Sequence, residues 1–272
     1  MMQKYHFISG LPRSGSTLLS AILKQNPRFH ADITDPLHEY IRGILQVTHQ
    51  AVGMETTVPV EKRAEILRGL FEVFYRNKPP VCFNTNRAWT AGMPLIKDLF
   101  PSSKIIACIR DVPWILDSFE QLNNKNPLTI KALYNHRDLP TVYERSHMLM
   151  GNEGGFVQGP LICLKQGIYG NDKSNLCIVD YDVLTKNPIN VMKRIYDFLE
   201  EPWFEHDVEN VEDSYDEFDR QANLIGLHTI RKKIEYIHRR PILPEDLWMH
   251  YSQSSFWKAD FDHMKKQLLW IE

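Results

Sequence analysis

Several features common in proteins of this size are scarce or missing. The 272 residues include only four cysteines, Cys82, Cys108, Cys163 and Cys177, and no two are close enough to form a metal knuckle. We therefore expect buried, reduced thiols. No stretch approaches the roughly 20 apolar residues that span a bilayer. Residues 1–7 also lack the apolar run of a secretory signal, so we expect a cytoplasmic protein that does not bind membranes.

An excess of one charge is also missing. The chain has 32 Lys and Arg against 34 Asp and Glu, which gives a net charge of −2. Nucleic-acid and acidic-membrane binding normally needs a strong positive excess. We expect neither partner, so any anion site must be local. The sequence leaves the oligomeric state open between monomer and homodimer.

Short β-branched runs alternate with amphipathic helical patterns, which is typical of a parallel sheet covered by helices. The runs Lys104–Arg110 and Asn175–Tyr181 are nearly continuous in apolar residues, as in strands buried on both faces. The other strand candidates are Tyr5–Leu11, Val81–Thr85 and Phe29–Ile33. We expect one α/β domain over residues 1–272, with a phosphate-loop, three-layer fold. Its central, mostly parallel sheet would have about five strands, with helices on both faces.

Two segments differ from this pattern. Residues 124–160 are polar and end in a glycine-rich stretch, so we expect either a mobile insertion that covers the substrate or a surface loop without a role. Further on, an acidic run between Asp207 and Asp219 is followed by basic residues between Arg231 and Arg240. The basic run is either a solvated face or a contact to phosphate.

The strongest motif runs from Phe7 to Leu19, Phe-Ile-Ser-Gly-Leu-Pro-Arg-Ser-Gly-Ser-Thr-Leu-Leu. A strand leads into Gly10, and Gly15 opens an amphipathic helix after a short turn. Backbone N–H groups at such a turn, together with the helix N-terminus, bind anions. The glycine spacing matches the nucleotide phosphate loop G-x-x-x-x-G-K-[ST]. Ser16, however, stands where enzymes that use ATP or GTP carry their lysine.

This substitution narrows the choice of donor. The cation of the loop is Arg13, in the middle of the turn. Such a loop suits a donor with one phosphate and a further anionic group in line, and it lacks the lysine that serves a metal-bridged triphosphate. We therefore expect that no metal is required. A phosphate-loop small-molecule kinase and a nucleotide-binding module without catalysis are the alternatives.

The segment Leu11-Pro-Arg-Ser-Gly-Ser-Thr17 resembles the 5′-phosphosulfate loop of the sulfotransferase family. That family also has an arginine at the end of a strand and a serine eight residues later, here Arg110 and Ser118. Apart from any resemblance, Arg110 ends a buried strand, at the edge where open α/β sheets bind ligands. The resemblance implies that Arg110 and Ser118 hold the donor's 3′-phosphate. It assigns the 5′-phosphosulfate to Pro12, Arg13, Ser14, Gly15, Ser16 and Thr17.

Two later elements also resemble the family. Asp180-Tyr-Asp-Val-Leu184 is similar to its Tyr-Glu-Asp-Leu element, which implies that Tyr181 lies near the adenine. Gly226-Leu-His-Thr-Ile-Arg-Lys-Lys233 resembles the segment that closes over the nucleotide, so residues 220–272 would form this cover. Arg231 and Lys233 are the candidates there for a 3′-phosphate contact, and the sequence does not choose between them.

The resemblance implies transfer of a sulfuryl group from 3′-phosphoadenosine 5′-phosphosulfate to a hydroxyl or amine of a small molecule, with adenosine 3′,5′-bisphosphate as product. Asn84-Thr-Asn-Arg-Ala-Trp89 is similar to an element of bacterial small-molecule members, which act in secondary metabolism. We expect Arg87 to end the third strand, at the position where cytosolic relatives carry a catalytic histidine. We expect it to face the transferring group, with a structural ion pair as the alternative.

The general base is harder to place. Protein-tyrosine relatives carry a glutamate shortly after the first helix, and the candidates in that neighbourhood are Asp35, His38 and Glu39. Asp35 also suits a helix N-cap before Pro36, and the other two could face solvent. If Asp32, Asp35 and Glu39 line the acceptor pocket, they favour a cationic acceptor such as an amine or a guanidinium compound.

Overall fold

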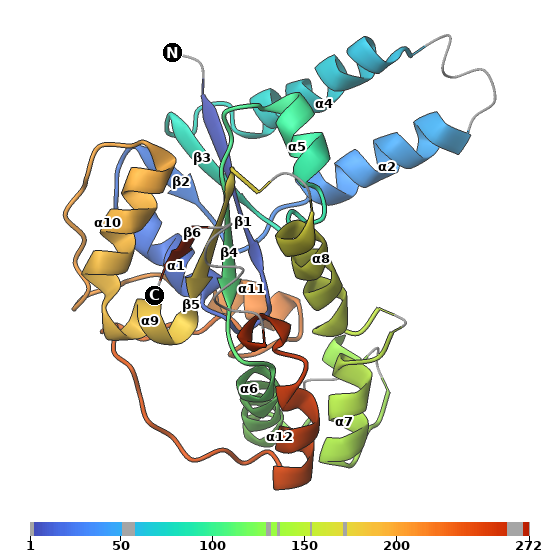
Figure 1. The fold of residues 1–272 in the computed structure, drawn as a ribbon, viewed down its shortest axis with the longest axis vertical. Coiled ribbons are helices and arrows are strands. Elements are labelled where there is room, and N and C mark those ends of the chain that lie inside the picture. The colour runs from blue at the N-terminus through green and yellow to red at the C-terminus, as the bar shows by residue number, and fades with distance from the viewer. Residues whose placement is uncertain are drawn as a thin grey trace.

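The fold is built on a six-stranded sheet in the order β2-β3-β1-β4-β5-β6, in which each strand is parallel to its neighbours (Figure 1). This computed structural model describes residues 3–50, 58–128, 132–134, 137–152, 154–170, 173–259 and 269–271, without the side chains of residues 49, 50 and 132. The strands are β1 Lys4–Gly10, β2 Phe29–Ala31, β3 Val81–Thr85, β4 Ile105–Ile109, β5 Leu176–Asp180 and β6 Leu269–Ile271.

Helices cover both faces of this sheet because side chains that alternate along its strands enter two separate cores. Phe7 of β1 packs in one buried cluster with residues of α4, α5, α6 and α8, and Ile8 packs in another with residues of α1 and α10. The helices are α1 Ser16–Leu23, α2 Leu37–Gln50, α4 Val60–Phe74, α5 Met93–Leu99, α6 Val112–Lys125, α7 Val142–Leu149, α8 Gln158–Tyr169, α9 Tyr181–Lys186, α10 Pro188–Leu199, α11 Asp216–Gln221 and α12 Glu245–Ser252, with short 3₁₀ turns η1 Ala132–Tyr134 and η2 Phe256–Lys258. The expected parallel sheet between helix layers is confirmed.

The sheet has a sixth strand, β6, besides the five strands that the sequence predicts. β6 pairs with β5 at the edge of the sheet and has only three residues, so no periodic pattern marks it in the sequence. The five strands that were expected all form, and their observed ends differ from the expected ones by at most two residues. The first and last strands of the chain thus belong to the same sheet.

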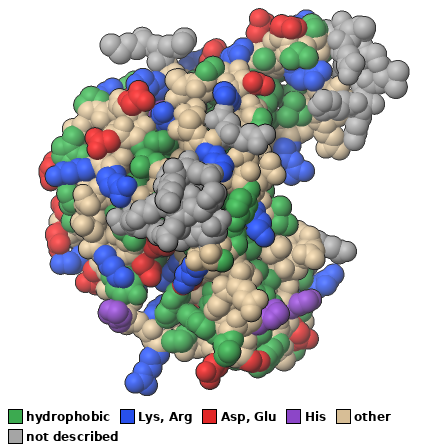
Figure 2. All heavy atoms as spheres, in the orientation of Figure 1, with side chains coloured by type: hydrophobic (Ala, Val, Ile, Leu, Met, Phe, Trp, Pro, Cys, Tyr) green, Lys and Arg blue, Asp and Glu red, His purple; other side chains and the backbone are tan. Residues whose placement is uncertain are grey.

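The surface agrees with the balanced composition. On the face drawn in Figure 2, Lys and Arg side chains are interspersed with Asp and Glu and do not gather into one basic patch. No described helix is long and apolar enough to cross a membrane.

The segment 124–160 contains the turn η1 and the helix α7. Thr141 caps α7 in a capping box with Glu144, because each side chain accepts a hydrogen bond from the other residue's backbone N–H. Arg145 then joins α7 to α6 through a bidentate ion pair with Glu120, with Nε–Oε2 and Nη2–Oε1 distances of 2.9 and 2.6 Å. Each of these two side chains is only 10% exposed, so the pair is largely desolvated. The described part of the segment is therefore anchored to the core.

This anchor leads to a stability prediction. Arg145→Met should lower the free energy of unfolding by about 3 kcal/mol, because it leaves the Glu120 carboxylate buried without its partner. Urea denaturation followed by circular dichroism measures the change. The control is Arg220→Met, which breaks an ion pair with Glu217 whose side chains are 67% and 65% exposed and should cost under about 1 kcal/mol. Equal losses in both variants would contradict this interpretation.

Candidate active site

The turn between β1 and α1 has a backbone that only some residues can adopt. Gly10 has a φ of +104°, and a Cβ there would lie 2.0 Å from the carbonyl oxygen of Cys108 on the neighbouring strand. Gly15 has a φ of +96°, and a Cβ there would lie 2.8 Å from Cδ2 of Tyr181. Between them Arg13 is left-handed with a φ of +57°, which is uncommon for a residue other than glycine. Both glycines are thus required by close approach, and the turn is a tight anion cradle.

This turn opens into a cavity of about 650 Å³ at the carboxyl edge of the sheet. Its walls come from residues 8–18, 33–42, 85–88, 110, 154–163, 181–185, 218 and 224–235, some of them only in part. Open α/β sheets bind their ligands at this edge. The end of segment 124–160 and a stretch of segment 220–272 both reach the cavity, as a covering role requires.

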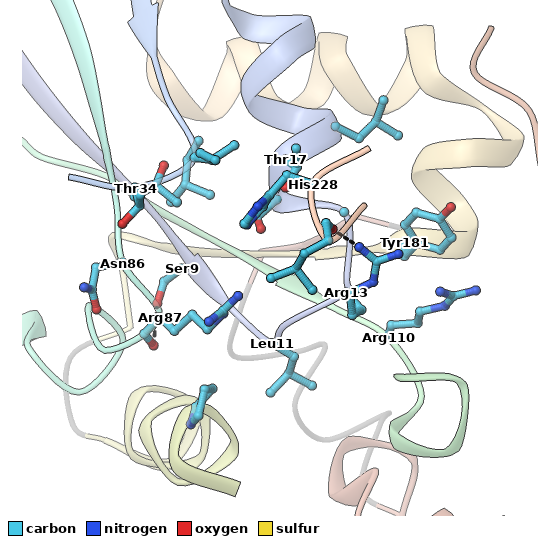
Figure 3. Close-up of a pocket in the computed structure, with 18 of the residues that line it drawn as sticks. Ser9, Leu11, Arg13, Thr17, Thr34, Asn86, Arg87, Arg110, Tyr181 and His228 are labelled. Atoms are coloured by element: carbon cyan, nitrogen blue, oxygen red, sulfur yellow. Dashed lines mark hydrogen bonds between the residues drawn. The ribbon is translucent and has the colours of Figure 1, made fainter. Parts of the chain in front are cut away.

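Three of the arginines that line this cavity are labelled in Figure 3. Arg13 donates from Nε to Oγ of Ser118 at 3.0 Å, and from Nη1 to the carbonyl oxygen of Leu227. The Arg110 guanidinium lies 4.3 Å from the ring centroid of Tyr181, and its buried Nε has no hydrogen-bond partner. Arg87 lies on the other side of β1 in Figure 3.

These guanidinium groups repel one another in a desolvated setting. Burial lowers the pKa of Arg13 to about 10, and the nearby charge of Arg110 acts in the same direction. Burial likewise lowers the pKa of Arg87 to about 10, with a further contribution from Arg13. Arg13 and Arg87 remain charged at neutral pH. Positive charges and an unpartnered Arg110 Nε beside a glycine turn fit a ligand with two anionic groups.

The loop residues expected to bind the donor do not all face the cavity. Gly15, Ser16 and Thr17 line it, whereas Pro12 and Ser14 do not. The Ser14 hydroxyl bonds to the carbonyl oxygens of Leu11 and, at 2.9 Å, Cys108, so it fixes the turn to the sheet. We therefore assign Ser14 a structural role in the loop.

The two candidates for a phosphate contact near the C-terminus differ in their partners. Both Arg231 and Lys233 line the cavity and are exposed. Lys233 forms a 2.7 Å ion pair with Glu209, which raises its pKa. Arg231 makes no ion pair with any described residue. Arg231 is therefore more available than Lys233 to bind a phosphate.

Sequence reasoning did not single out Arg239, although it belongs to the basic run. Its guanidinium pairs with the buried Asp117 and lies 4.9 Å from the ring centroid of Trp114. Burial lowers the pKa of Arg239, and Asp117 opposes that shift. Asp117 also accepts a bond from the backbone N–H of Ile242 at 2.6 Å. Arg239 thus fastens the C-terminal segment to α6 next to Arg110.

Arg87 faces the cavity without an ion pair to any described residue. Its guanidinium lies 4.5 Å from the ring centroid of Phe156, which comes from the end of the segment 124–160. Its backbone is held because the Ser9 hydroxyl donates to the Arg87 carbonyl oxygen at 3.0 Å. The geometry therefore favours the expected orientation toward a ligand over a structural ion pair.

Asp35 does not line the cavity. Its carboxylate accepts hydrogen bonds from the Leu37 backbone at 2.9 Å, the Tyr75 hydroxyl at 3.1 Å and Asn84 Nδ2 at 2.5 Å. Burial raises the pKa of Asp35, and these three donors oppose that shift. Trp89 Nε1 donates to the other end of Asn84 at 2.7 Å. Asp35 thus caps α2 and supports the cavity wall from behind, so we do not retain it as a base.

Two other candidates do reach the cavity. His38 and Glu39 line it, with 3.1 Å between Nδ1 of His38 and Oε1 of Glu39. Glu39 also lies 3.7 Å from Arg42, another residue of the wall. Asp32 is not on the wall, and one of its carboxylate oxygens accepts from the Ile33 N–H at 2.8 Å. Of the three carboxylates considered for the acceptor, only Glu39 faces the cavity.

Sequence reasoning missed a histidine of the cavity. His228 lies on the wall, and its Nδ1 is 2.5 Å from Oδ1 of the buried Asp219. Asp219 lies on α11, and His228 follows nine positions later, beyond the end of that helix, a spacing that no regular element predicts. The only sequence signal was their position at the junction of the acidic run and the segment that resembles the nucleotide cover.

Comparisons with known proteins agree with this geometry. A family model described as the sulfotransferase family matches residues 6–205. The chain belongs to the sulfotransferase family. The resemblance found in the phosphate loop is thereby confirmed.

Individual relatives are distant. The protein-tyrosine sulfotransferase A of Caenorhabditis elegans is 25% identical over 244 residues, which cover 81% of this chain and 59% of the relative. The chain thus matches less than two thirds of that protein's length. Two solved structures share the fold, a sulfotransferase domain from the curacin biosynthetic pathway and one from the Synechococcus PCC 7002 olefin synthase. The curacin domain has a TM-score of 0.54 at 14% identity, and the match covers 94% of this chain and 98% of that domain. The olefin synthase domain has a TM-score of 0.50 at 15% identity, and the match covers 94% of this chain and 95% of that domain.

The unpartnered Arg110 leads to a prediction about stability. Arg110→Met should leave the free energy of unfolding unchanged or raise it by about 1 kcal/mol, because the buried Nε no longer lacks a partner. Arg239→Met is the matched control and should cost about 3 kcal/mol, since it leaves Asp117 buried and unpaired. Urea unfolding of both variants measures this. A large loss in Arg110→Met would show that Arg110 is structural.

Proposed function

We propose that this enzyme transfers the sulfuryl group of 3′-phosphoadenosine 5′-phosphosulfate to a hydroxyl or amine of a small molecule and releases adenosine 3′,5′-bisphosphate. The observation that carries the proposal is the phosphate turn with Ser16 in place of lysine, set in one cavity with Arg13 and Arg110. A cradle of this kind suits two separate anionic groups on one nucleotide.

The residues of the cavity divide between the two ends of the donor. Backbone N–H groups of the turn, with the hydroxyls of Ser16 and Thr17, would hold the 5′-phosphosulfate. Arg110 and Arg231 would hold the 3′-phosphate, together with Ser118, which bonds to Arg13 but does not itself line the cavity. Arg13 contacts Ser118 directly, so it would bind between the two groups and not at one end alone.

Tyr181 would lie beside the nucleotide base. Its ring stacks under the Arg110 guanidinium and lies against Gly15. A flat aromatic surface at this place suits an adenine, because every base has a π-face.

Arg87 would act on the group that is transferred. Negative charge builds on the oxygen that leaves with the phosphate, and a buried guanidinium stabilises such charge more strongly than one in water. A sulfuryl group carries less charge than a phosphoryl group, so protein cations can serve where kinases use magnesium. We therefore propose that transfer needs no divalent metal.

The acceptor end of the cavity gives little support for a cationic acceptor. Among the charged wall residues that the structure describes, two are acidic, Glu39 and Glu235, and six are basic, namely Arg13, Arg42, Arg87, Arg110, Arg231 and Lys233. Glu39 is already close to Arg42. The guanidinium or amine acceptor suggested by the acidic sequence around Asp32 thus depends on Glu39 alone, and we propose a neutral hydroxyl compound ahead of it.

Nucleotide binding tests the donor assignment. Isothermal titration calorimetry should show binding of adenosine 3′,5′-bisphosphate in EDTA. Arg13→Ala and Arg110→Ala should each weaken it roughly ten- to a hundredfold, since a charge-assisted bond contributes about 1.5–3 kcal/mol. Arg220→Ala, on an exposed ion pair, is the control and should bind as the parent does. Tighter binding of ATP–magnesium than of the bisphosphate would contradict the donor assignment and favour a kinase.

Acceptor class is tested with ³⁵S-labelled donor and matched neutral and cationic compounds, such as 2-phenylethanol, 4-nitrophenol, tyramine and agmatine. We expect the neutral hydroxyl compounds to be sulfated at least as well as the cationic ones, with the same order of preference in Glu39→Gln. The opposite result, sulfation of cationic compounds alone that disappears in Glu39→Gln, would restore the cationic acceptor.

A further inference from the structure

The cavity contains a histidine–carboxylate pair that none of the roles above uses. The His228 ring donates from Nδ1 to Oδ1 of Asp219 at 2.5 Å, and the His228 backbone N–H donates to Oδ2 at 2.9 Å. Both oxygens of one carboxylate therefore hold the same residue. The Asp219 side chain is 2% exposed and that of His228 12% exposed, so solvent hardly competes for these bonds.

This arrangement fixes the tautomer of the ring. With a carboxylate against Nδ1, the proton of a neutral imidazole lies on Nδ1, and Nε2 keeps a free lone pair. In Figure 3, His228 lies between Thr17 of the phosphate turn and Arg87, all three on the wall of the same cavity. The free nitrogen is thus available to a group at the site where the 5′-phosphosulfate would meet an acceptor.

We propose that His228 is the general base of this enzyme and that Asp219 is the residue that positions it. The proposal rests on the proposed sulfuryl transfer and adds the residue that accepts the proton. The His228 Nε2 takes the proton from the acceptor hydroxyl, whose oxygen forms the new bond to sulfur. The bond between sulfur and the bridging oxygen breaks, and its electron pair leaves with adenosine 3′,5′-bisphosphate.

The charges around the ring support this role. Burial lowers the pKa of His228 below its usual 6.5, Asp219 on α11 opposes the shift, and Arg87 and Arg13 reinforce it. Two aromatic rings also lie near the imidazole, those of Tyr215 and Phe218, with centroids at 6.4 and 5.5 Å. The ring is therefore neutral at pH 7 and able to accept a proton.

The rival candidates on the wall are held less firmly. The partner of His38 is Glu39, its neighbour in the chain, whose side chain is 65% exposed and also approaches Arg42. Arg13 donates to the carbonyl oxygen of Leu227, the residue before His228, and Arg87 lies on the same cavity wall, so His228 is near the cations expected to hold the transferring group. His228 thus combines a fixed tautomer with the right surroundings.

The first test does not need an acceptor. Correlation NMR of protein with ¹⁵N-labelled histidine, in the presence of adenosine 3′,5′-bisphosphate, should show His228 protonated at Nδ1 and bare at Nε2 at neutral pH. In Asp219→Asn the amide can donate to the ring, so the Nε2–H tautomer should become populated. A ring that is doubly protonated at pH 7, or protonated at Nε2 in the parent, would overturn the proposal.

The second test uses turnover. His228→Asn keeps an N–H for Asp219 but has no basic nitrogen, so it should lower sulfation of 4-nitrobenzyl alcohol, and the release of labelled sulfate to water, about a hundredfold or more. Loss with 4-nitrophenol should be much smaller at mildly alkaline pH, because that acceptor is already ionised. The parent rate should also fall in acid as His228 becomes protonated. His250→Asn, on an exposed position of α12, is the matched control.

The outcomes separate this proposal from the proposed function. Calorimetry should show that His228→Asn binds adenosine 3′,5′-bisphosphate within about threefold of the parent, since the variant leaves the arginines in place. If the parent itself fails to bind the bisphosphate, the proposed function fails. If the parent binds it but His228→Asn keeps its full rate, or His38→Asn or Glu39→Gln loses the rate instead, only the assignment of His228 is overturned.

Discussion

The mutual repulsion of Arg13, Arg87 and Arg110 is the constraint on which this site depends. Burial and the neighbouring arginines both lower the pKa values of Arg13 and Arg87, so holding these cations together costs folding free energy. A chain with a net charge of −2 can sustain this local field only if few carboxylates approach it. Within the described residues, the cavity wall has just Glu39 and Glu235. The two apolar cores beside the sheet hold the edge in place, and an anionic ligand would relieve the repulsion.

The parts of the molecule that local physics determines could be predicted from sequence. The phosphate turn is one of them, because the close approach of Gly10 to Cys108 and of Gly15 to Tyr181 requires glycine at two fixed positions. The buried strands are another, since continuous apolar runs have few alternatives in an α/β chain. β6 has only three residues, and its pairing with β5 is decided by the rest of the fold. No local pattern therefore identifies it.

The roles of acidic residues were much harder to predict, because the function of a carboxylate depends on the residues that contact it in the folded structure. Asp35 follows the first helix, where protein-tyrosine relatives carry a glutamate, but its partners Tyr75 and Asn84 lie 40 and 49 residues away. These contacts hold Asp35 behind the cavity wall. Trp89 in turn donates to Asn84, so the Asn84–Trp89 element supports the position of Asp35. Asp219 belongs to the acidic run of the sequence, yet the turn after α11 buries it against His228. Both results come from tertiary packing.

The donor site and the proposed base are mechanically connected. Arg13 is held by Ser118 on α6 and in turn bonds to the carbonyl oxygen of Leu227, one residue before His228. The same guanidinium that would bind the donor thus fixes the backbone that presents the imidazole. Electrostatics links them as well, because Arg13 and Arg87 lower the pKa of His228. An anionic donor on these arginines would offset their field, so the imidazole would become a stronger base only when a sulfuryl group is in place to be transferred.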